Sequence, residues 1–477
     1  MTDNLETAKN LFLASLEFQQ NGDLVRAIKS LEEAYDLYPS RESIINNLII
    51  LYFSTNDSER LSNLIHKIEN DGNVKYKQLG HLYLEFLNNN FQNCINLSHS
   101  LLVTNLGLEI QIIDILIKAY FRVGDISNML TYSRKYLKNK SNYNQKLFAV
   151  GNAMLCLSKP RAAKWYIEKS LKLNFDRNFA LDLGFCYLQL KDFKNGFNFL
   201  EKRFEGYHSK IQLFKETPQL ENLNNIQQKK IVVWYEQGIG DTLQFARYIK
   251  LLKEYQPNIT LVIQDKLLDL FKEFDSNINI VSYDDVKNEK FDFQSSLLNL
   301  IPLLNSSYEE IPYEKLKLSF ALTNSSNKFK VGFAHSGNPE YSRDLYRSIQ
   351  SNIFQELFNL PNIEFFKLNS KFEDYIENYE NIFDYGHLSI YEIAQKLSGF
   401  NLVITTDTFL VHLCGSLNVK CILLLNYNSD WRWFDDIKHT QWYPSVRILK
   451  QKKILKWEPI IKTLMRFLKK KSNIFIK

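Results

Sequence analysis

Hydrophobic positions in the N-terminal half of the chain recur at an interval of about 34 residues. The first is Ala27, which follows the turn-like run Asn21-Gly22-Asp23. Steps of the same length reach only apolar residues: Leu61, Ile95, Met129, Ala163 and Phe197. Polar or glycine-containing turns keep the same phase: Asn56-Asp57, Asn89-Asn90, Gly124-Asp125, Ser158-Lys159 and Lys191-Asp192. The pattern predicts six degenerate pairs of antiparallel helices.

Small residues in this pattern indicate where paired helices come closest, because a bulky side chain would hold them apart. Ala27, Ala34 and Ala163 occupy such positions. Residues 8–205 resemble a tetratricopeptide array; the alternative is a nonrepetitive helical bundle with an accidental period. We therefore assign 1–205 to a helical repeat array, whose concave face would bind a peptide or protein segment.

Short β-branched runs alternate with amphipathic stretches in the C-terminal half, after a connector at 206–229. The predicted strands are 231–234, 259–263, 278–281, 330–333, 363–366, 402–405 and 421–425, and the predicted helices are 242–255, 266–274, 391–397 and 409–417. This alternation is typical of parallel sheets covered by helices. It predicts two Rossmann-like αβα units, 230–325 and 329–453, that face a cleft and bind ligands at the carboxyl ends of their strands.

Charge and cysteine content exclude several classes of protein. The net charge of +6 is small for 477 residues and gives no reason to expect a nucleic-acid partner. The five cysteines form no Cys-x-x-Cys pair, which argues against a disulfide framework and favours a reducing compartment, so we expect a cytoplasmic protein. No Asp-x-Asp or His-Glu-x-x-His spacing occurs, and we expect neither a metal nor another cofactor.

The first candidate loop follows the strand at 231–234. Gly238 and Gly240 would let the backbone turn sharply and come close to a ligand. Asp241 stands at the start of the next predicted helix, where it is a candidate functional acid. With Gln244 three residues later, Asp241 also fits a capping box, and spacing alone does not decide between the two roles.

The second candidate loop, Asp407-Thr408, lies between the strand at 402–405 and the helix at 409–417. A helix N-terminus offers free N–H groups and the positive end of a dipole, so a diphosphate would be bound there with help from the Thr408 hydroxyl. His412 lies on the same helix face. A cap followed by a half-buried structural histidine is the alternative, and for His412 alone it is the preferred one.

The third candidate loop is Ser336-Gly337-Asn338-Pro339, with Arg343 and Arg347 downstream. Arginine suits fork-like contacts with phosphate oxygens. Taken singly, each arginine is better explained as a solvated surface charge.

Four strings in sequence order resemble bacterial tetratricopeptide-repeat glycosyltransferases whose GT-B domain is related to ADP-heptose:lipopolysaccharide heptosyltransferases. They span roughly 231–450 and are as follows: Glu236-Gln237-Gly238-Ile239-Gly240-Asp241-Thr242-Leu243-Gln244-Phe245-Ala246-Arg247-Tyr248; Ser336-Gly337-Asn338-Pro339 with Arg347-Ser348-Ile349; Asp407-Thr408 with His412-Leu413; and Asp430-Trp431-Arg432-Trp433 with Trp442-Tyr443-Pro444. The combination of helical repeats with a GT-B domain is also similar in plan to protein O-GlcNAc transferases.

This resemblance implies metal-independent, inverting transfer from a nucleotide-diphosphate sugar to a protein or glycan acceptor recruited by the array. Asp241 is the implied base. The implied donor-binding residues are Gly238, Gly240, Ser336, Gly337, Asn338, Arg343, Arg347, Asp407, Thr408 and His412. The chain departs from the family at Phe409, where a small residue is common, and at His335, where close relatives often carry tryptophan.

Two other functions stay open on the sequence. One is an interaction scaffold with an inactive GT-B remnant, which Phe409 favours, and the other is a nucleotide-sugar epimerase. For the enzyme, we expect the array to select the acceptor and to contribute nothing to donor binding.

The last segment, 454–477, combines apolar residues at helical spacing with a basic end. We expect a helix that returns to the first αβα unit and buries Ile461, Leu464 and Leu468. A peripheral membrane contact through the basic C-terminus is the alternative.

Overall fold

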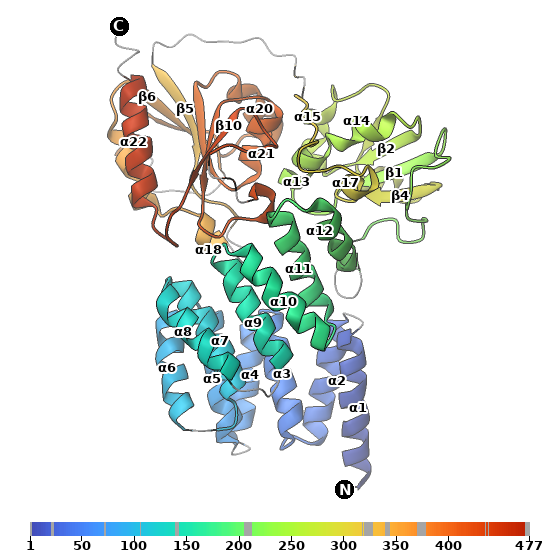
Figure 1. Cartoon of the computed structure of the whole chain (residues 1–477), viewed down its shortest axis with the longest axis vertical. Helices are drawn as coiled ribbons and strands as arrows, with labels where there is room; N and C mark the ends of the chain where they lie inside the picture. The colour runs from blue at the N-terminus through green and yellow to red at the C-terminus, as the bar shows by residue number, and fades with distance from the viewer. Residues whose placement is uncertain are drawn as a thin grey trace. The chain divides into compact units, whose positions relative to one another are not determined.

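The computed structural model describes residues 2–20, 23–70, 73–104, 106–138, 143–204, 212–316, 318, 328–338, 344–369, 378–434, 436 and 438–472. Figure 1 shows the chain coloured from the N-terminus to the C-terminus. The chain forms two compact units. One contains Met1–Cys186 and Phe199–Gln212, and the other contains Tyr187–Asn198 and Leu213–Lys477.

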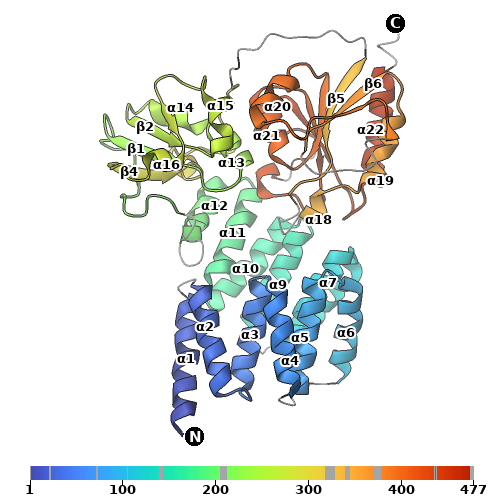
Figure 2. The same cartoon turned by 180° about the vertical axis from the view of Figure 1, so that it is seen from behind.

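Successive helices build the N-terminal part (Figure 2). They are α1 (Thr2–Gln20), α2 (Leu24–Leu37), α3 (Glu42–Ser54), α4 (Ser58–Asn70), α5 (Val74–Leu87), α6 (Phe91–Val103), α7 (Glu109–Val123), α8 (Ile126–Lys138), α9 (Tyr143–Cys156), α10 (Pro160–Leu173), α11 (Arg177–Gln189) and α12 (Phe193–Leu200). Every even-numbered helix carries one of the predicted apolar positions near its start, and each of these side chains is buried. The predicted helical repeat array is confirmed.

The turns inside the helix pairs explain the polar and glycine residues found there. A left-handed residue ends the first helix of each described turn: Asn56, Asn89, Gly124, Ser158 and Lys191. This conformation terminates helices and favours glycine or asparagine. The next residue then donates its N–H back into the finished helix, as Asp57 does to the Tyr52 carbonyl at 2.8 Å. Asn21 and Gly22 of the first predicted turn lie outside the described residues.

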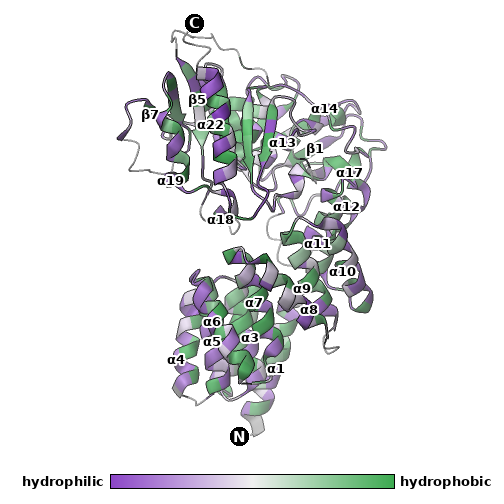
Figure 3. Ribbon diagram, turned by 60° about the vertical axis from the view of Figure 1, so that its left-hand side comes forward, coloured by the Kyte–Doolittle hydropathy of each residue, from purple (hydrophilic) through white to green (hydrophobic). Residues whose placement is uncertain are grey.

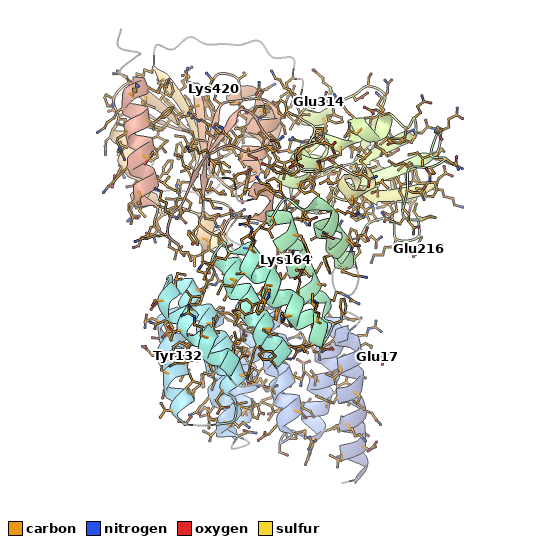
Figure 4. The ribbon with its side chains drawn as sticks, in the orientation of Figure 1. Glu17, Tyr132, Lys164, Glu216, Glu314 and Lys420 are labelled. Atoms are coloured by element: carbon orange, nitrogen blue, oxygen red, sulfur yellow. The ribbon has the colours of Figure 1, made fainter. Side chains whose placement is uncertain are left out.

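Contacts between helices confirm the close-approach positions. Ala27, Ala34 and Ala163 have no exposed surface. A Cβ added to Gly151 of α9 would lie 2.6 Å from the Ile167 side chain of α10. Elsewhere aromatic side chains fill the space between helices; Tyr132 of α8, labelled in Figure 4, stacks on Tyr120 of α7 at a centroid distance of 5.7 Å.

The first α/β unit is a parallel sheet with strand order β3-β2-β1-β4. Its strands are β1 (Lys230–Trp234), β2 (Asn258–Val262), β3 (Asn279–Val281) and β4 (Phe293–Ser296), and its helices are α13 (Ile239–Phe245), α14 (Tyr248–Lys253), η3 (Asp265–Leu267), α15 (Leu268–Phe271), α16 (Tyr283–Val286) and α17 (Leu300–Leu303). The three predicted strands are present. The helix predicted at 242–255 begins earlier, at Ile239, and is divided into α13 and α14.

The second α/β unit is a parallel sheet with strand order β10-β9-β8-β5-β6-β7. Its strands are β5 (Phe329–Ala334), β6 (Ile363–Lys367), β7 (Ile382–Asp384), β8 (Leu402–Thr406), β9 (Cys421–Leu425) and β10 (Val446–Lys450), and its helical segments are α18 (Asp344–Arg347), α19 (Ser351–Phe354), η4 (Gln355–Asn359), α20 (Ile390–Leu397), α21 (Phe409–Ser416), η6 (Trp431–Trp433) and α22 (Glu458–Ser472). The predicted fold class, a helical solenoid followed by two Rossmann-like units, is confirmed.

Helix α22 corrects one prediction. Ile461, Leu464 and Leu468 are buried as expected, but the hydrophobic cluster around them consists of second-unit residues, including Phe329 of β5 and Phe365 of β6. The helix therefore packs on the second αβα unit and not on the first. Figure 1 shows α22 beside β5 and β6, and Figure 3 shows the hydrophilic and hydrophobic stripes that this packing requires. Among the described residues, no helix combines the length and apolar character needed to cross a bilayer.

Candidate functional site

The three candidate loops lie where the topology of the sheets predicts ligand sites. Open parallel sheets bind ligands outside the carboxyl ends of their strands, at the point where the strand order reverses. In the first sheet this point lies between β1 and β4, and in the second between β5 and β8. The Gly238–Asp241 loop follows β1, the Ser336–Asn338 loop follows β5, and Asp407-Thr408 follows β8. All three loops therefore occupy a switch point.

Asp241 has a structural role in addition to any chemical one. It is the third residue of α13, and its Oδ2 accepts a hydrogen bond from the Gly238 N–H at 3.1 Å. The N-cap is Gly238, so the predicted capping box of Asp241 with Gln244 is wrong in register. The Gln244 side chain is instead fully buried.

Arg432 is the main partner of the Asp241 carboxylate. Its Nη2 lies 2.5 Å from Asp241 Oδ1, and the two side chains are 12% and 23% exposed. The same guanidinium contacts Asp430 Oδ1 at 2.8 Å and Gln237 Oε1 at 2.9 Å. Burial raises the pKa of Asp241 and Arg432 opposes that rise, with the net result above the ordinary value. A carboxylate with a raised pKa, fixed by hydrogen bonds, suits proton transfer near neutral pH.

The space beside Asp241 is small. A cavity of about 10 Å³ at the edge between β1 and β4 is lined by Glu236, Gln237, Asp241, Thr242, Phe245, Leu297 and Leu298. This volume is close to what one water needs. A hydroxyl group of a substrate therefore matches the room available next to the carboxylate.

Gly240 is required by packing between helices. A Cβ at this position would lie 2.8 Å from His412 Cδ2 and 3.4 Å from Phe409 Cα. Helix α13 thus lies against the first turn of α21, and the predicted approach of Gly240 to a ligand stays a prediction. Gly238 has φ −73°, an ordinary value for any residue, and a Cβ there would meet only Asp241 Oδ2 at 3.7 Å.

The β8–α21 loop places a hydroxyl and an acid at a helix N-terminus. Thr408 is the N-cap of α21, and its Oγ1 accepts from the Leu410 N–H at 3.4 Å. Burial and the neighbouring Asp430 raise the pKa of Asp407 to about 6. Phe409 opens the helix and is half-buried. The predicted helix start is confirmed, with Thr408 in the capping role.

Arg347 joins the loops after β5 and β8. Its Nη1 donates to the Asp407 carbonyl at 2.8 Å, and its Nε pairs with Asp344 Oδ1 at 2.7 Å. A Cβ on Gly337 would lie 2.5 Å from Arg347 Nη2. Any side chain at position 337 would therefore clash with the Arg347 guanidinium. Arg347 is well placed for an anion at the start of α21, while Arg343 and Pro339 lie outside the described residues.

The other residues of the β5 loop differ in exposure. Ser336 is buried and accepts a hydrogen bond from Asn369 Nδ2 at 2.9 Å, whereas Asn338 is exposed. His335 is also buried, with Nδ1 2.8 Å from the Ile349 carbonyl. His335 thus belongs to the core of the second unit.

His412 has the environment of a structural histidine. It is 5% exposed, stacks on Trp433 at 5.4 Å, and has Nδ1 3.0 Å from the Tyr443 hydroxyl. Burial, together with Arg432 and Arg247, lowers its pKa to about 3. The ring is therefore neutral at pH 7 and brings no positive charge to a phosphate.

Sequence reasoning assigned no role to Arg432, although its Asp-Trp-Arg-Trp string carries part of the resemblance. The structure brings Arg432 together with Asp241 from a distant segment. The sequence signal for this contact was the composition of the string, in which Arg432 stands between two tryptophans and follows Asp430. An arginine that only carries a surface charge has no need of such neighbours.

A larger cavity, of about 370 Å³, lies away from Asp241. Its lining includes Leu243, Arg247 and Ser416, together with the ion pair of Lys250 and Glu314, of which Glu314 is labelled in Figure 4. Arg247 donates to the carbonyls of Pro312 and Trp442. Arg247, Lys250 and Glu314 thus each have a partner within the protein.

No protein-family model matches the sequence, and no curated protein matches it. Solved structures do. The chain is similar to the E. coli ADP-heptose lipopolysaccharide heptosyltransferase II, with 12% identity over 51% of this chain and 99% of that one and a TM-score of 0.37. It is similar to a variant of the Thermobaculum terrenum O-GlcNAc transferase, with 8% identity over 89% of this chain and 83% of that one and a TM-score of 0.26.

A third structure is a tetratricopeptide repeat protein from Parabacteroides merdae, with 14% identity over 42% of this chain and 80% of that one and a TM-score of 0.28. The structural neighbours thus include repeat proteins, heptosyltransferases and an O-GlcNAc transferase.

Proposed function

We propose that this chain is a glycosyltransferase that moves a sugar from a nucleotide-diphosphate donor to a protein or glycan acceptor. The observation that carries the proposal is the Asp241 carboxylate, fixed between the Gly238 N–H and Arg432 at a switch point, with a raised pKa. The loops after β5 and β8 supply a second, anion-compatible region at the start of α21.

The proposed reaction is metal-independent and inverting. Asp241 removes the proton from an acceptor hydroxyl, whose oxygen attacks the anomeric carbon of the donor. The bond from that carbon to the diphosphate oxygen breaks, and the leaving diphosphate takes the electron pair. Thr408, the N–H groups of α21 and Arg347 stabilise the charge that develops there.

The location and the acceptor belong to the same proposal. None of the five cysteines, all of which are among the described residues, forms a disulfide, and this fits the reducing cytoplasm. The helical array would recruit the acceptor, as solenoids commonly bind protein segments.

The first test separates the chemistry of Asp241 from its capping role. Asp241→Asn keeps an oxygen that can accept from Gly238 but cannot act as a base, so transfer should fall by a factor on the order of 100 or more with little change in melting temperature. Asp285→Asn is a matched control, because Asp285 caps α16 in the same way, accepting from the Ser282 N–H at 3.0 Å. Full activity of Asp241→Asn, assayed with a panel of nucleotide sugars, would contradict the proposal.

The second test concerns the donor. Thr408→Val removes the hydroxyl at nearly constant volume and should weaken nucleotide-diphosphate affinity by about 1 to 3 kcal/mol. Thermal shift on titration with the nucleotide measures this by linkage. If no nucleotide shifts the melting temperature of the natural protein, the alternative of a scaffold with an inactive remnant is favoured. Epimerised donor without transfer would favour the epimerase.

A further inference from the structure

The turn between α11 and α12 belongs to the same compact unit as the candidate site. Residues Tyr187–Asn198 group with the α/β part of the chain. Lys191, in the turn, forms an ion pair with Asp436 at 2.9 Å, and the Asp436 side chain is only 12% exposed. The Lys191 ammonium also lies 4.1 Å from the ring centroid of Tyr308, whose hydroxyl is 3.3 Å from Asp436 Oδ2. This ion pair therefore anchors one end of the segment that contains Arg432.

A strained residue lies next to this anchor. Phe434 has φ +50° and ψ −143°, a conformation that side-chain-bearing residues rarely adopt and that costs on the order of 1 to 3 kcal/mol. Its ring stacks on Phe193 of α12 at 5.8 Å and on Trp442 at 5.9 Å, and it meets the edge of Tyr308 at 4.8 Å. Such a conformation persists only where packing enforces it, and Phe193 supplies one wall of that packing.

Two further contacts extend the same interface along η6. Gln189 Nε2 donates to the Ser429 carbonyl at 3.3 Å, and Phe197 meets Trp431 edge-on at 6.0 Å. We call the described residues 429–434 and 436 the arginine loop, because Arg432 lies among them. The end of α11, the turn and α12 together thus contact the arginine loop at Ser429, Trp431, Phe434 and Asp436.

We propose that Lys191 and Phe193 are positioning residues for the transfer reaction: by fixing the arginine loop they hold the Arg432 guanidinium against the Asp241 carboxylate. The inference rests on the proposed function, in which Asp241 is the base. It makes the last predicted helix pair part of the machinery of the site, and not only a means of selecting an acceptor.

The consequence is a defined pH dependence. The titratable and charged groups that face Asp241 are Arg432, Asp430, Glu236 and Tyr443. Of these, Arg432 favours the ionised carboxylate, and the acids oppose it. If the arginine loop loosens, Arg432 moves away and the pKa of Asp241 rises further. A base works only when deprotonated, so the acid limb of the activity profile must then move to higher pH.

The test compares kcat/KM against pH for the full-length protein and for Lys191→Met. A rise of one unit in the pKa of Asp241 lowers activity about tenfold on the acid limb and leaves the high-pH plateau unchanged. The KM for the donor should not change. Lys191→Arg keeps a cation at this position and should restore the natural profile. Asp436→Asn removes the same ion pair from the other side and should give the same shift, should Lys191→Met fail to fold.

Lys253→Met is the matched control. The Lys253–Asp275 ion pair has a length of 2.7 Å and side-chain exposures of 36% and 14%, against 2.9 Å, 36% and 12% for Lys191–Asp436. It lies in the first α/β unit, away from the arginine loop. Its loss should leave the pH profile in place. An equal shift in Lys253→Met, or an equal loss of activity at every pH in Lys191→Met, would overturn the positioning role.

A readout without activity keeps the inference separate from the proposed function. In a double-mutant cycle on unfolding free energy, Lys191→Met and Arg432→Met should be coupled although the two side chains share no contact, because the loop connects them. Coupling in a protein that transfers no sugar would leave the positioning in place and reject the enzyme. Additive effects of the two substitutions in an active enzyme would reject the positioning role and leave the proposed function in place.

Discussion

Asp407 combines a half-buried carboxyl with a neighbouring acid, and its pKa of about 6 makes stability depend on pH. The folded-state pKa is raised above the value of about 3.9 expected for an unfolded chain. The folded protein therefore binds a proton that the unfolded chain has lost. The contribution of Asp407 to stability is complete below pH 4 and is lost as the pH rises through 6.

Asparagine at position 407 cannot ionise, so Asp407→Asn should remove the loss of stability that accompanies the ionisation of Asp407. Relative to the natural protein, Asp407→Asn should gain unfolding free energy between pH 4 and pH 8, by about 1 to 2 kcal/mol once partial exposure is allowed for. Denaturant unfolding at five pH values measures the difference.

Asp275 provides a control of opposite sign for this measurement. Burial would raise its pKa, but the Lys253 ammonium and the Asn277 N–H outweigh that effect and lower it. Asp275→Asn should therefore lose stability relative to the natural protein as the pH rises. A flat difference for Asp407→Asn would mean that Asp407 titrates normally.

The sequence located the site better than it assigned roles within it. Hydroxyls, acids and glycines after predicted strands were enough to find all three loops. The cap of α13 was misassigned because a glycine N-cap such as Gly238 leaves no side-chain signature. The contact of Arg432 with Asp241 joins segments far apart in the chain, and no local pattern encodes such a pair.

Among the elements, α13 and α21 are coupled through Gly240. A methyl group there would press on the His412 ring and approach the Phe409 backbone, so Gly240→Ala should destabilise the protein by about 1 to 3 kcal/mol despite its higher helix propensity. Gly238→Ala, which meets only a flexible carboxylate oxygen at 3.7 Å, is the matched control and should cost less. Thermal and denaturant unfolding of the two variants, each compared with the natural protein, test the packing. Equal costs at both positions would show that the α13–α21 contact is looser than the structure indicates.

Strand β4, which the sequence did not reveal, has a composition that hides it. In β4, Gln294, Ser295 and Ser296 are buried polar residues, so the strand carries no hydrophobic run. Its polar groups are satisfied internally; Trp234 Nε1, for example, donates to Gln294 Oε1 at 2.6 Å. Helix α22 shows a second limit of prediction from sequence. Its apolar stripe predicted burial correctly, but a stripe does not specify which surface covers it.

For the whole molecule, periodicity predicted the order of parts but not where one compact unit ends. The 34-residue interval groups the sixth helix pair with the five before it, because the Lys191-Asp192 turn and the apolar residue Phe197 occur at the expected positions. Contacts decide otherwise for Tyr187–Asn198, whose side chains pack on the arginine loop. The expectation that the array contributes nothing to donor binding stays a prediction, and the revision concerns only the boundary at residue 205.

Two truncated proteins test that boundary. A chain that starts at Lys229 lacks Lys191 and Phe193, so Asp436 keeps the Tyr308 hydroxyl but loses its cation, and one face of Phe434 is uncovered. The loss of a buried phenylalanine contact alone costs about 3 to 5 kcal/mol, and the strain at Phe434 would no longer be enforced. A chain that starts at Asp176 keeps α11, the turn and α12. We expect the longer protein to melt cooperatively and to be stabilised by the nucleotide that stabilises the full chain, and the shorter one to melt at lower temperature or aggregate. Equal melting temperatures and equal nucleotide shifts for the two would return the boundary to residue 205 and make the α11–α12 turn dispensable for the site.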